Sequence, residues 1–257
     1  MKKKYGQNFL INENIVNIII SEANINKESC IYEVGAGSGI LTAQIIKKNP
    51  KKFISLEIDV FLKEKLNKLF SNTGYKIIFD DALKFDEKKY FKDNITLISN
   101  LPYNISIQLL IKWIFLQVEF GIFKELILMF QKEVAERIIA KENTKKFGRI
   151  TLLTSAAFNV VKLKDVGKEY FNPIPKVDST LLKFTPLKKE RLNTKELINL
   201  EKISIKLFSN RRKKIKKNLT DLLNKENIPI LQFENLFELR AENINRFVYF
   251  NLAKLIK

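Results

Sequence analysis

The chain has 257 residues, 46% of them apolar, which is enough for one large α/β domain with a small appendage or for two modest domains. It contains no histidine, which excludes Ser-His-Asp and Cys-His catalysis and every metal site that includes histidine. Its one cysteine, Cys30, excludes an intrachain disulfide and a site made of cysteines alone, so we expect no bound metal.

The chain is strongly basic, with 46 Lys and Arg against 28 Asp and Glu and a formal net charge of +18. Such a charge is typical of proteins that bind a polyanion, and nucleic acid is the first candidate. A general bias toward lysine in the composition is the alternative source of part of this charge. The basic start is not followed by an apolar signal-peptide core, and Lys112 and Gln117 interrupt the densest apolar run, residues 105–118. We therefore expect a soluble, cytoplasmic protein with no membrane partner.

From residue 30, short β-branched runs alternate with segments of helical spacing, a pattern typical of a mostly parallel α/β sheet. Strands are expected over residues 30–34, 53–58, 75–79, 95–99 and 124–130, and helices over residues 40–48, 60–70, 107–117 and 133–140. Segments 158–163 and 177–184 are expected to form an antiparallel pair at the end of the sheet.

The pattern changes after Thr185-Pro186, because from about residue 194 the chain lacks strand-like runs and favours several short helices. The sequence therefore predicts two domains, a larger α/β domain over residues 1–187 and a small all-helical domain over residues 188–257.

A glycine-rich turn, Gly35-Ala36-Gly37-Ser38-Gly39, joins the first expected strand to the first expected helix. Glycines there let the backbone turn sharply and let a ligand approach closely. Glu57 and Asp81 follow the next two strands, where a carboxylate can bind ribose hydroxyls and an adenine amino group. Two carboxylates and no Lys or Arg in the turn favour S-adenosylmethionine over NAD. The alternatives are a dinucleotide turn, and helix-capping or solvated roles for the two acids.

Asn100-Leu101-Pro102-Tyr103 follows the fourth expected strand. The amino nitrogen of adenine is a weak nucleophile, because its lone pair is delocalised into the ring. Two acceptors, the Asn100 side-chain oxygen and a backbone carbonyl held by the Pro102 turn, would bind both N–H groups and direct the lone pair at a methyl donor. Tyr103 offers a face on which an extruded base can stack. The alternative is an ordinary proline turn with a buried tyrosine.

These motifs, with several others in the same order, resemble those of the small-subunit ribosomal RNA adenine dimethyltransferase family. The shared segments span nearly the whole chain: 5–10, 35–39, 56–59, 81–82, 100–106, 131–135, 147–149, 171–179 and 240–243. Departures are minor, since Ala36 replaces a frequent proline and Tyr170 adds an aromatic residue before Phe171.

The resemblance implies a Rossmann-like class I methyltransferase fold and a cytoplasmic enzyme that dimethylates two adjacent adenosines in the 3′-terminal hairpin of small-subunit rRNA. It implies S-adenosylmethionine as cofactor, an immature ribosomal subunit as partner, and a monomer. It assigns residues 1–187 to catalysis and residues 188–257 to RNA or ribosome contact. It implies a cofactor site of Asn8, Leu10, Gly35, Gly37, Glu57, Asp81 and Asn100, and a target-base site of Asn100, Leu101, Pro102, Tyr103 and Phe171. For Phe171, a core position is the alternative.

Two basic segments are candidates for RNA contact: Lys3 and Lys4 beside the cofactor cover, and Arg211, Arg212 and Lys213 in the densest basic run. The alternative for this run is a solvated surface. Three other functions stay open: a large-subunit rRNA adenine methylase of the macrolide-resistance type, a ribosome-assembly checkpoint with secondary catalysis, and, more distantly, an NAD-dependent dehydrogenase.

Overall fold

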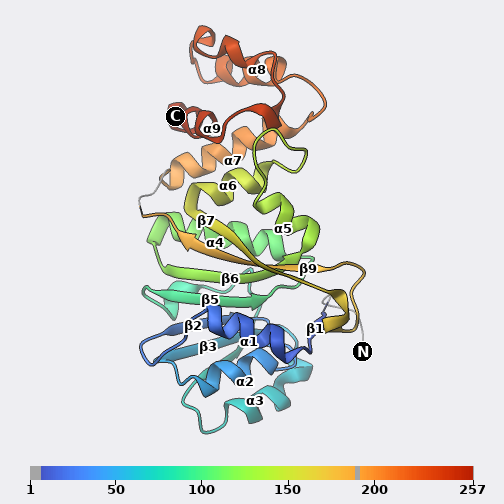
Figure 1. Ribbon diagram of the computed structural model, residues 1–257. Coiled ribbons are helices and arrows are strands. Elements are labelled where there is room, and N and C mark those ends of the chain that lie inside the picture. Colours follow the sequence, from blue (N-terminus) through green and yellow to red (C-terminus); the bar gives the residue numbers. More distant parts are fainter. Residues whose placement is uncertain (1–6, 189–191, 257) are drawn as a thin grey trace. The chain divides into compact units, whose positions relative to one another are not determined.

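The computed structural model describes residues 7–188 and 192–256. Its main feature is a seven-stranded sheet in the order β4-β3-β2-β5-β6-β9-β7 (Figure 1). The strands β4, β3, β2, β5 and β6 are parallel, and β9 runs antiparallel to β6. The mostly parallel sheet predicted from the sequence is thus confirmed. The strand bounds are Cys30–Val34 (β2), Lys52–Glu57 (β3), Lys76–Phe79 (β4), Ile95–Asn100 (β5), Phe123–Gln131 (β6), Phe158–Val166 (β7) and Ser179–Pro186 (β9).

Successive strands are added on one side of β2 and then on its other side, and the candidate site lies at this change of direction. From β2 the chain passes to β3 and then β4 on one side, whereas β5 and β6 are added on the other side. Right-handed crossovers therefore put α2 (Ile40–Lys47) and α3 (Lys63–Phe70) on one face and α4 (Ser106–Phe120) on the opposite face. The carboxyl ends of β2 and β5 meet at the reversal, where ligands bind in sheets of this kind.

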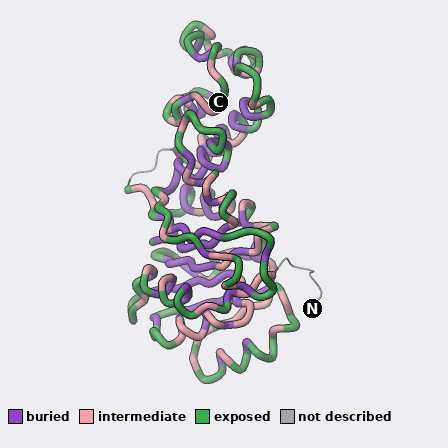
Figure 2. The backbone as a smooth tube through the Cα atoms, turned by 45° about the vertical axis from the view of Figure 1, so that its right-hand side comes forward, coloured by how far each residue is buried: buried purple, intermediate pink, exposed green. Residues whose placement is uncertain are grey.

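A helix that the sequence predictions omit, α1 (Glu13–Glu22), precedes the sheet. It packs against α2 on the near face in Figure 1. Asn12 caps its start by accepting a hydrogen bond from the Ile15 amide, and Ile15, Val16, Ile19 and Ile20 form its buried stripe. These residues join the apolar core of the sheet, together with Ile31, Phe53 and Phe171. Burial is concentrated in the central strands (Figure 2).

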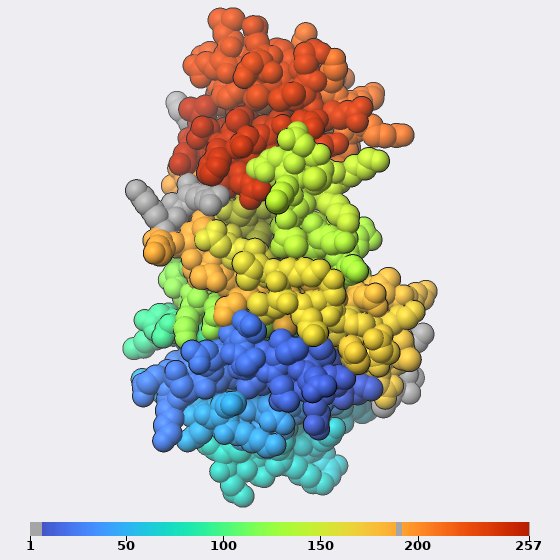
Figure 3. Space-filling model, viewed as in Figure 1, coloured from blue at the N-terminus to red at the C-terminus, as the bar shows by residue number. Residues whose placement is uncertain are grey.

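Two short strands, β1 (Phe9–Leu10) and β8 (Phe171–Asn172), form a separate antiparallel pair. This pairing brings the start of the described chain beside the loop between β7 and β9, and the two segments adjoin on the face shown in Figure 3. Residues 7–11, which we call the N-terminal arm, also bond to this loop where the Ile11 amide donates to the Tyr170 carbonyl at 2.9 Å.

The chain divides into two compact units. The first contains most of the sheet, and the second contains residues 114–120, 136–159 and 187–257. The helical C-terminal region is confirmed, and the chain passes for the last time from the first unit to the second between Pro186 and Leu187. The second unit also contains two earlier segments, and α6 in the later of them packs against α7 and α9. The remaining helix bounds are Lys132–Ile138 (α5), Arg149–Ala157 (α6), Thr194–Phe208 (α7), Lys216–Lys225 (α8) and Arg246–Leu255 (α9).

Candidate active site

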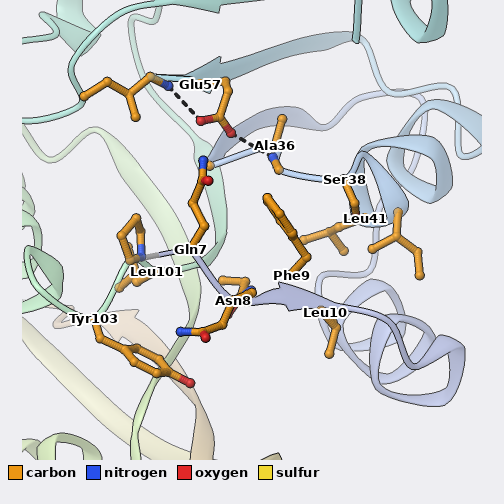
Figure 4. A pocket seen from close by; sticks show the side chains of 16 residues that line it. Gln7, Asn8, Phe9, Leu10, Ala36, Ser38, Leu41, Glu57, Leu101 and Tyr103 are labelled. Carbon is orange, nitrogen blue, oxygen red and sulfur yellow. Dashed lines mark hydrogen bonds between the residues drawn. The ribbon is translucent and has the colours of Figure 1, made fainter. Parts of the chain in front are cut away.

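A cavity opens at the carboxyl ends of β2, β3 and β5, where the strand order reverses. Four segments line it: residues 7–10 of the arm, residues 35–41 at the glycine turn except Gly39, residues 57–58, and residues 100–103. Among these described lining residues Glu57 is the one charged side chain, and none is Lys or Arg. In Figure 4, Gln7 and Phe9 extend toward Glu57, Ala36 and Ser38, whereas Asn8 lies toward Tyr103.

The glycine turn has the backbone conformation for which its sequence is suited. Gly35 and Gly37 have φ angles of +79° and +54°, in the left-handed region that L side chains rarely adopt. A Cβ built on Gly37 would lie 2.8 Å from the Cδ1 atom of Phe9, so only glycine lets the arm come this close. The cavity is therefore bounded by bare backbone on one side and by the arm on the other.

Glu57 connects the glycine turn to the end of β3 through its carboxylate, which accepts from three amides. Oε2 accepts from the Gly37 amide at 2.8 Å, and Oε1 accepts from the amides of Ile58 and Asp59, each at 2.9 Å. The side chain is buried, and this burial raises the pKa of Glu57 although the three amides oppose the shift. Glu57 holds the glycine turn and also presents an acceptor at the cavity wall.

A second acidic residue, Glu33, lies under the turn within β2 and was not among the sequence candidates. Thr42 and Ser55 donate to its Oε2 atom, each at 2.7 Å, while Oε1 is buried without a hydrogen-bond partner. Desolvation is the main cause that raises the pKa of Glu33 to about 7, and the two hydroxyl donors oppose it. Glu33 does not line the cavity, so its contribution is to the base of the turn.

Asn100 ends β5 and lines the cavity. Its Nδ2 atom donates to the backbone carbonyl of Asn8 in the arm at 2.9 Å. Because a carboxamide is planar with the donor and acceptor on opposite sides, this bond fixes which end of the group is oxygen. The site thus contains an amide whose orientation is set by the arm.

Tyr103 also lines the cavity, and β9 holds its hydroxyl group. That oxygen lies 2.6 Å from Oγ of Ser179, and burial raises the pKa of the phenol. The carbonyl of Pro102 accepts from the Ile105 amide at 3.2 Å, so it is engaged in the turn that leads to α4. The preceding carbonyl, that of Leu101, which also lines the cavity, therefore becomes our candidate for the backbone acceptor.

Two predicted site residues lie elsewhere in this structure. Asp81 is not among the residues that line the cavity; its Oδ1 accepts from the Leu83 amide at 2.9 Å and caps the turn after β4. Phe171, expected to form a wall of the base pocket, does not line this cavity either. It is 1% exposed and packs in the core, where its backbone pairs with Leu10. This position agrees with the alternative of a core phenylalanine, and contact of Phe171 with a base stays a prediction.

The basic run lies in the turn between α7 and α8. Arg212 and Lys213 are exposed, as RNA contact requires. Arg211 is half-buried, and its guanidinium donates to the carbonyls of Lys145 and Phe147 at 2.8 and 2.6 Å. Arg211 thus has a structural role within the second unit. The predicted residues Lys3 and Lys4 lie outside the described residues.

A surface hollow in the second unit brings Arg212 together with basic residues that the sequence analysis did not single out. It is lined by Lys145, Lys214 and Arg240, and also by two acidic residues, Glu238 and Glu242, of which Glu238 pairs with Lys214. The amide side chains of Asn143 and Asn243 are among its other polar residues. Arg240 and Asn243 belong to one of the shared sequence motifs, but no chemistry could be assigned to them without the fold. Loop 143–145 is far from both in sequence, so only the tertiary structure brings the set together.

Within the described ranges, no group of three acidic or cysteine side chains is placed to hold a metal ion. In the same part of the chain, no helix is long and apolar enough to span a membrane.

Comparison with known proteins identifies the family. A family model described as ribosomal RNA adenine dimethylase matches residues 1–256. The chain belongs to this family. Three relatives named ribosomal RNA small subunit methyltransferase A extend the agreement along the whole length. The protein of Pelagibacter ubique is 42% identical and covers 98% of this chain and 95% of the relative. Those of Ehrlichia ruminantium and Borreliella burgdorferi are 36% and 37% identical, covering 99% and 95% of this chain and 97% and 84% of the relatives.

Solved structures agree with this membership of the ribosomal RNA adenine dimethylase family. A dimethyladenosine transferase from Plasmodium falciparum is 26% identical, has a TM-score of 0.81, and covers 95% of each chain. The 23S rRNA methyltransferase ErmE is 19% identical, with a TM-score of 0.68 over 97% of this chain and 99% of that chain. The second similarity concerns the fold alone, so the fold does not separate small-subunit from large-subunit enzymes.

Proposed function

We propose that this protein uses S-adenosylmethionine to dimethylate the exocyclic N6 atoms of two adjacent adenosines in the 3′-terminal hairpin of small-subunit rRNA. The observation that carries the proposal is the junction of the glycine turn with Asn100-Leu101-Pro102-Tyr103 in one cavity. The names of the relatives, which are small-subunit enzymes, support the choice of RNA. They favour it over the large-subunit alternative, whose similarity to this chain is one of fold.

The chemistry of the cavity fits S-adenosylmethionine. The described lining contains no cationic side chain that would attract a pyrophosphate, and its one charge is the carboxylate of Glu57. Phe9 and Tyr103 add aromatic faces, which favour a cation. When bound, the cofactor supplies an electrophilic methyl group on a positively charged sulfur. Glu57 would accept hydrogen bonds from its ribose, and the bare backbone at Gly35 and Gly37 would let it approach closely. Asn8, Leu10 and Asn100 complete this proposed site, and Asp81 would join it from the turn after β4.

Asn100 and Leu101 would activate the adenine amino group. The carboxamide oxygen of Asn100 accepts one N–H and the Leu101 carbonyl accepts the other, which favours a pyramidal nitrogen with its lone pair exposed. These contacts strengthen as positive charge develops on the nitrogen, so they stabilise the transition state more than the ground state. The amine loses its proton after the transfer, and no side chain has to remove it beforehand.

Tyr103 would hold the extruded base in place. The bond between its hydroxyl group and Ser179 fixes the ring, so that its face can stack on adenine without a loss of side-chain entropy at that moment. Base stacking on an aromatic ring contributes about 1–3 kcal/mol in comparable sites.

RNA contact is proposed for the hollow of the second unit and for Arg212 and Lys213. Four basic side chains from three separate segments meet there against two glutamates, an excess of positive charge that suits binding to phosphates without reading of sequence. An immature small subunit as the partner, a monomeric enzyme and action in the cytoplasm complete the proposal.

The test is incubation of the purified protein with labelled S-adenosylmethionine in two parallel reactions, one with unmethylated small subunits and one with unmethylated large-subunit RNA. We expect dimethyladenosine in the 3′-terminal hairpin. Label confined to large-subunit RNA would transfer the assignment to the macrolide-resistance type of methylase, and tight subunit binding without any label would favour a checkpoint protein.

The Asn100→Ala variant tests the mechanism. Loss of the oriented acceptor should lower kcat by about 100-fold or more, as removal of one transition-state hydrogen bond does elsewhere. Circular dichroism serves as the control for folding. Turnover close to that of the unmodified enzyme would show that the carboxamide is not the acceptor.

A further inference from the structure

Hydrogen bonds attach the N-terminal arm to the rest of the structure at two places. The β1–β8 pairing helps to form the core, whereas the second attachment lies at the surface. On one side, β1 pairs with β8 and the Ile11 amide donates to the Tyr170 carbonyl. On the other side, Nε2 of Gln7 donates to Oδ2 of Asp59 at 3.0 Å. Gln7 is only half-buried, so this bond adds little to the apolar core. It joins the first described residue of the arm to the turn after β3.

Asp59 is well suited to hold the arm, because its own position is fixed. Its amide donates to Oε1 of Glu57 at 2.9 Å, and its Oδ1 accepts from the Phe61 amide at 3.0 Å. Oδ2 is the oxygen that accepts from Gln7. The carboxylate is thus oriented by its neighbours, and the fixing point is linked through Glu57 to the glycine turn.

Between these two attachments, the arm is hydrogen-bonded to the side chain of Asn100, the proposed acceptor for the target amine. The carbonyl of Asn8 accepts from Nδ2 of Asn100 at 2.9 Å. Without an acceptor at this place, the two orientations of the carboxamide differ little in energy. One orientation would present its NH₂ group to the adenine amine, where a donor would face a donor.

We propose that Gln7 and Asp59 are positioning residues for methyl transfer: their hydrogen bond holds the arm so that the Asn8 carbonyl turns the carboxamide oxygen of Asn100 toward the target amine. The inference rests on the proposed function and adds to it a role for the arm beyond covering the cofactor. The position of the arm over the cavity and the orientation of the Asn100 carboxamide are therefore coupled. The target base therefore meets a correctly turned amide only when the cavity is covered.

The test compares Gln7→Ala, Asp59→Ala, the double variant and Asp59→Asn. The asparagine variant loses the same charge as Asp59→Ala but keeps a side chain that can pair with the Gln7 amide. At saturating S-adenosylmethionine, we expect each alanine variant to lower kcat roughly tenfold, because the acceptor is no longer pre-oriented. The cofactor Kd measured by calorimetry should change much less than kcat, Asp59→Asn should stay close to the unmodified enzyme, and the double variant should be no worse than either single one.

The Asn100 side-chain amide gives a readout that does not depend on activity. Its hydrogen exchange, followed by NMR of the full chain, should quicken in Gln7→Ala and stay slow in Asp59→Asn. Three results would overturn the inference: unchanged kcat with only a weaker cofactor Kd, additive losses in the double variant, or unchanged exchange at Asn100. An unmodified protein that fails to make dimethyladenosine would instead refute the proposed function, while the exchange experiment would still decide the inference.

Discussion

Glu33 shows how a single buried group makes stability depend on pH. The side chain is 1% exposed, with two hydroxyl donors at one oxygen and no hydrogen-bond partner at the other. Burial therefore disfavours the charged form, and the pKa rises from 4.5 to about 7. A raised pKa means that the folded state binds a proton more tightly than the unfolded chain does. The stability from this group is fully present below pH 4.5 and is lost as the pH rises to about 7.

The Glu33→Gln variant should remove this pH dependence. Glutamine keeps an oxygen for Thr42 and Ser55 and carries no charge, so its stability relative to the unmodified protein should increase between about pH 4.5 and 7. The gain reaches at most on the order of 3 kcal/mol, from 1.36 kcal/mol per pKa unit. Urea unfolding at pH 5 and pH 8 measures it, with the exposed Glu64→Gln as the control. An equal difference at both pH values would show that Glu33 does not titrate in this range.

At the scale of single elements, alternation and turn residues predicted the parallel strands well, because central strands are short, apolar and bounded by polar turns. The strand expected over residues 30–34 is β2 itself. The helix α6 gave a weaker signal, because residues 150–157 are all buried and the residues at polar helical spacing are only Thr151, Thr154 and Ser155, with no charged face. The helix α1 did carry a signal, an Asn12 cap before a regular apolar stripe, and could have been found.

The residues of the candidate site that the sequence could predict are those at the ends of strands, such as Glu57 and Asn100. The sheet alone brings such positions together. Phe171 and Arg211 depend instead on how a loop or a turn packs, which the local sequence does not contain. Gln7 and Asp59 were missed for the same reason, since a bond between residues far apart in sequence becomes visible only in the folded chain.

A buried ion pair fixes the loop that begins at Asp81. Nζ of Lys112, on α4, lies 2.8 Å from Oε2 of Glu87 and 2.8 Å from the Ala82 carbonyl, and it also bonds to the Phe85 carbonyl. Trp113 donates to the same carboxylate at 3.1 Å. Glu87 is 1% exposed, so Lys112 is needed to compensate the negative charge of its carboxylate.

The Lys112→Met variant should therefore destabilise the protein by about 3 kcal/mol, because it leaves the Glu87 charge buried and unpaired. It should also raise the KM for S-adenosylmethionine, since the loop carrying Asp81 loses its attachment to α4. Chemical denaturation and steady-state kinetics measure the two effects. Adding Glu87→Gln should restore part of the stability while KM stays high. A double variant no more stable than Lys112→Met would show that the unpaired charge is not the cause.

For the molecule as a whole, the net charge of +18 does not by itself say which basic residues meet RNA. Within the basic run, the structure distinguishes adjacent arginines by the groups that they contact. Arg211 bonds to two carbonyls of the loop before α6 and lies over the ring of Phe208, whereas Arg212 is exposed at the basic hollow. The same charge thus serves folding at one position and is available for phosphates at the next.

This difference gives a matched pair of variants at adjacent positions. Arg211→Ala should lower the free energy of unfolding by about 2 kcal/mol, because two charge-assisted hydrogen bonds are lost. Arg212→Ala with Lys213→Ala should leave thermal unfolding unchanged but weaken binding to unmethylated small subunits. It should also reduce the slope of log K against log salt by about 1–2, in proportion to the phosphate contacts removed. Binding titrations at several salt concentrations, with thermal melts of both proteins, measure these effects. An unchanged slope would mean that Arg212 and Lys213 are a solvated surface, and that the RNA is held by other basic residues of the chain.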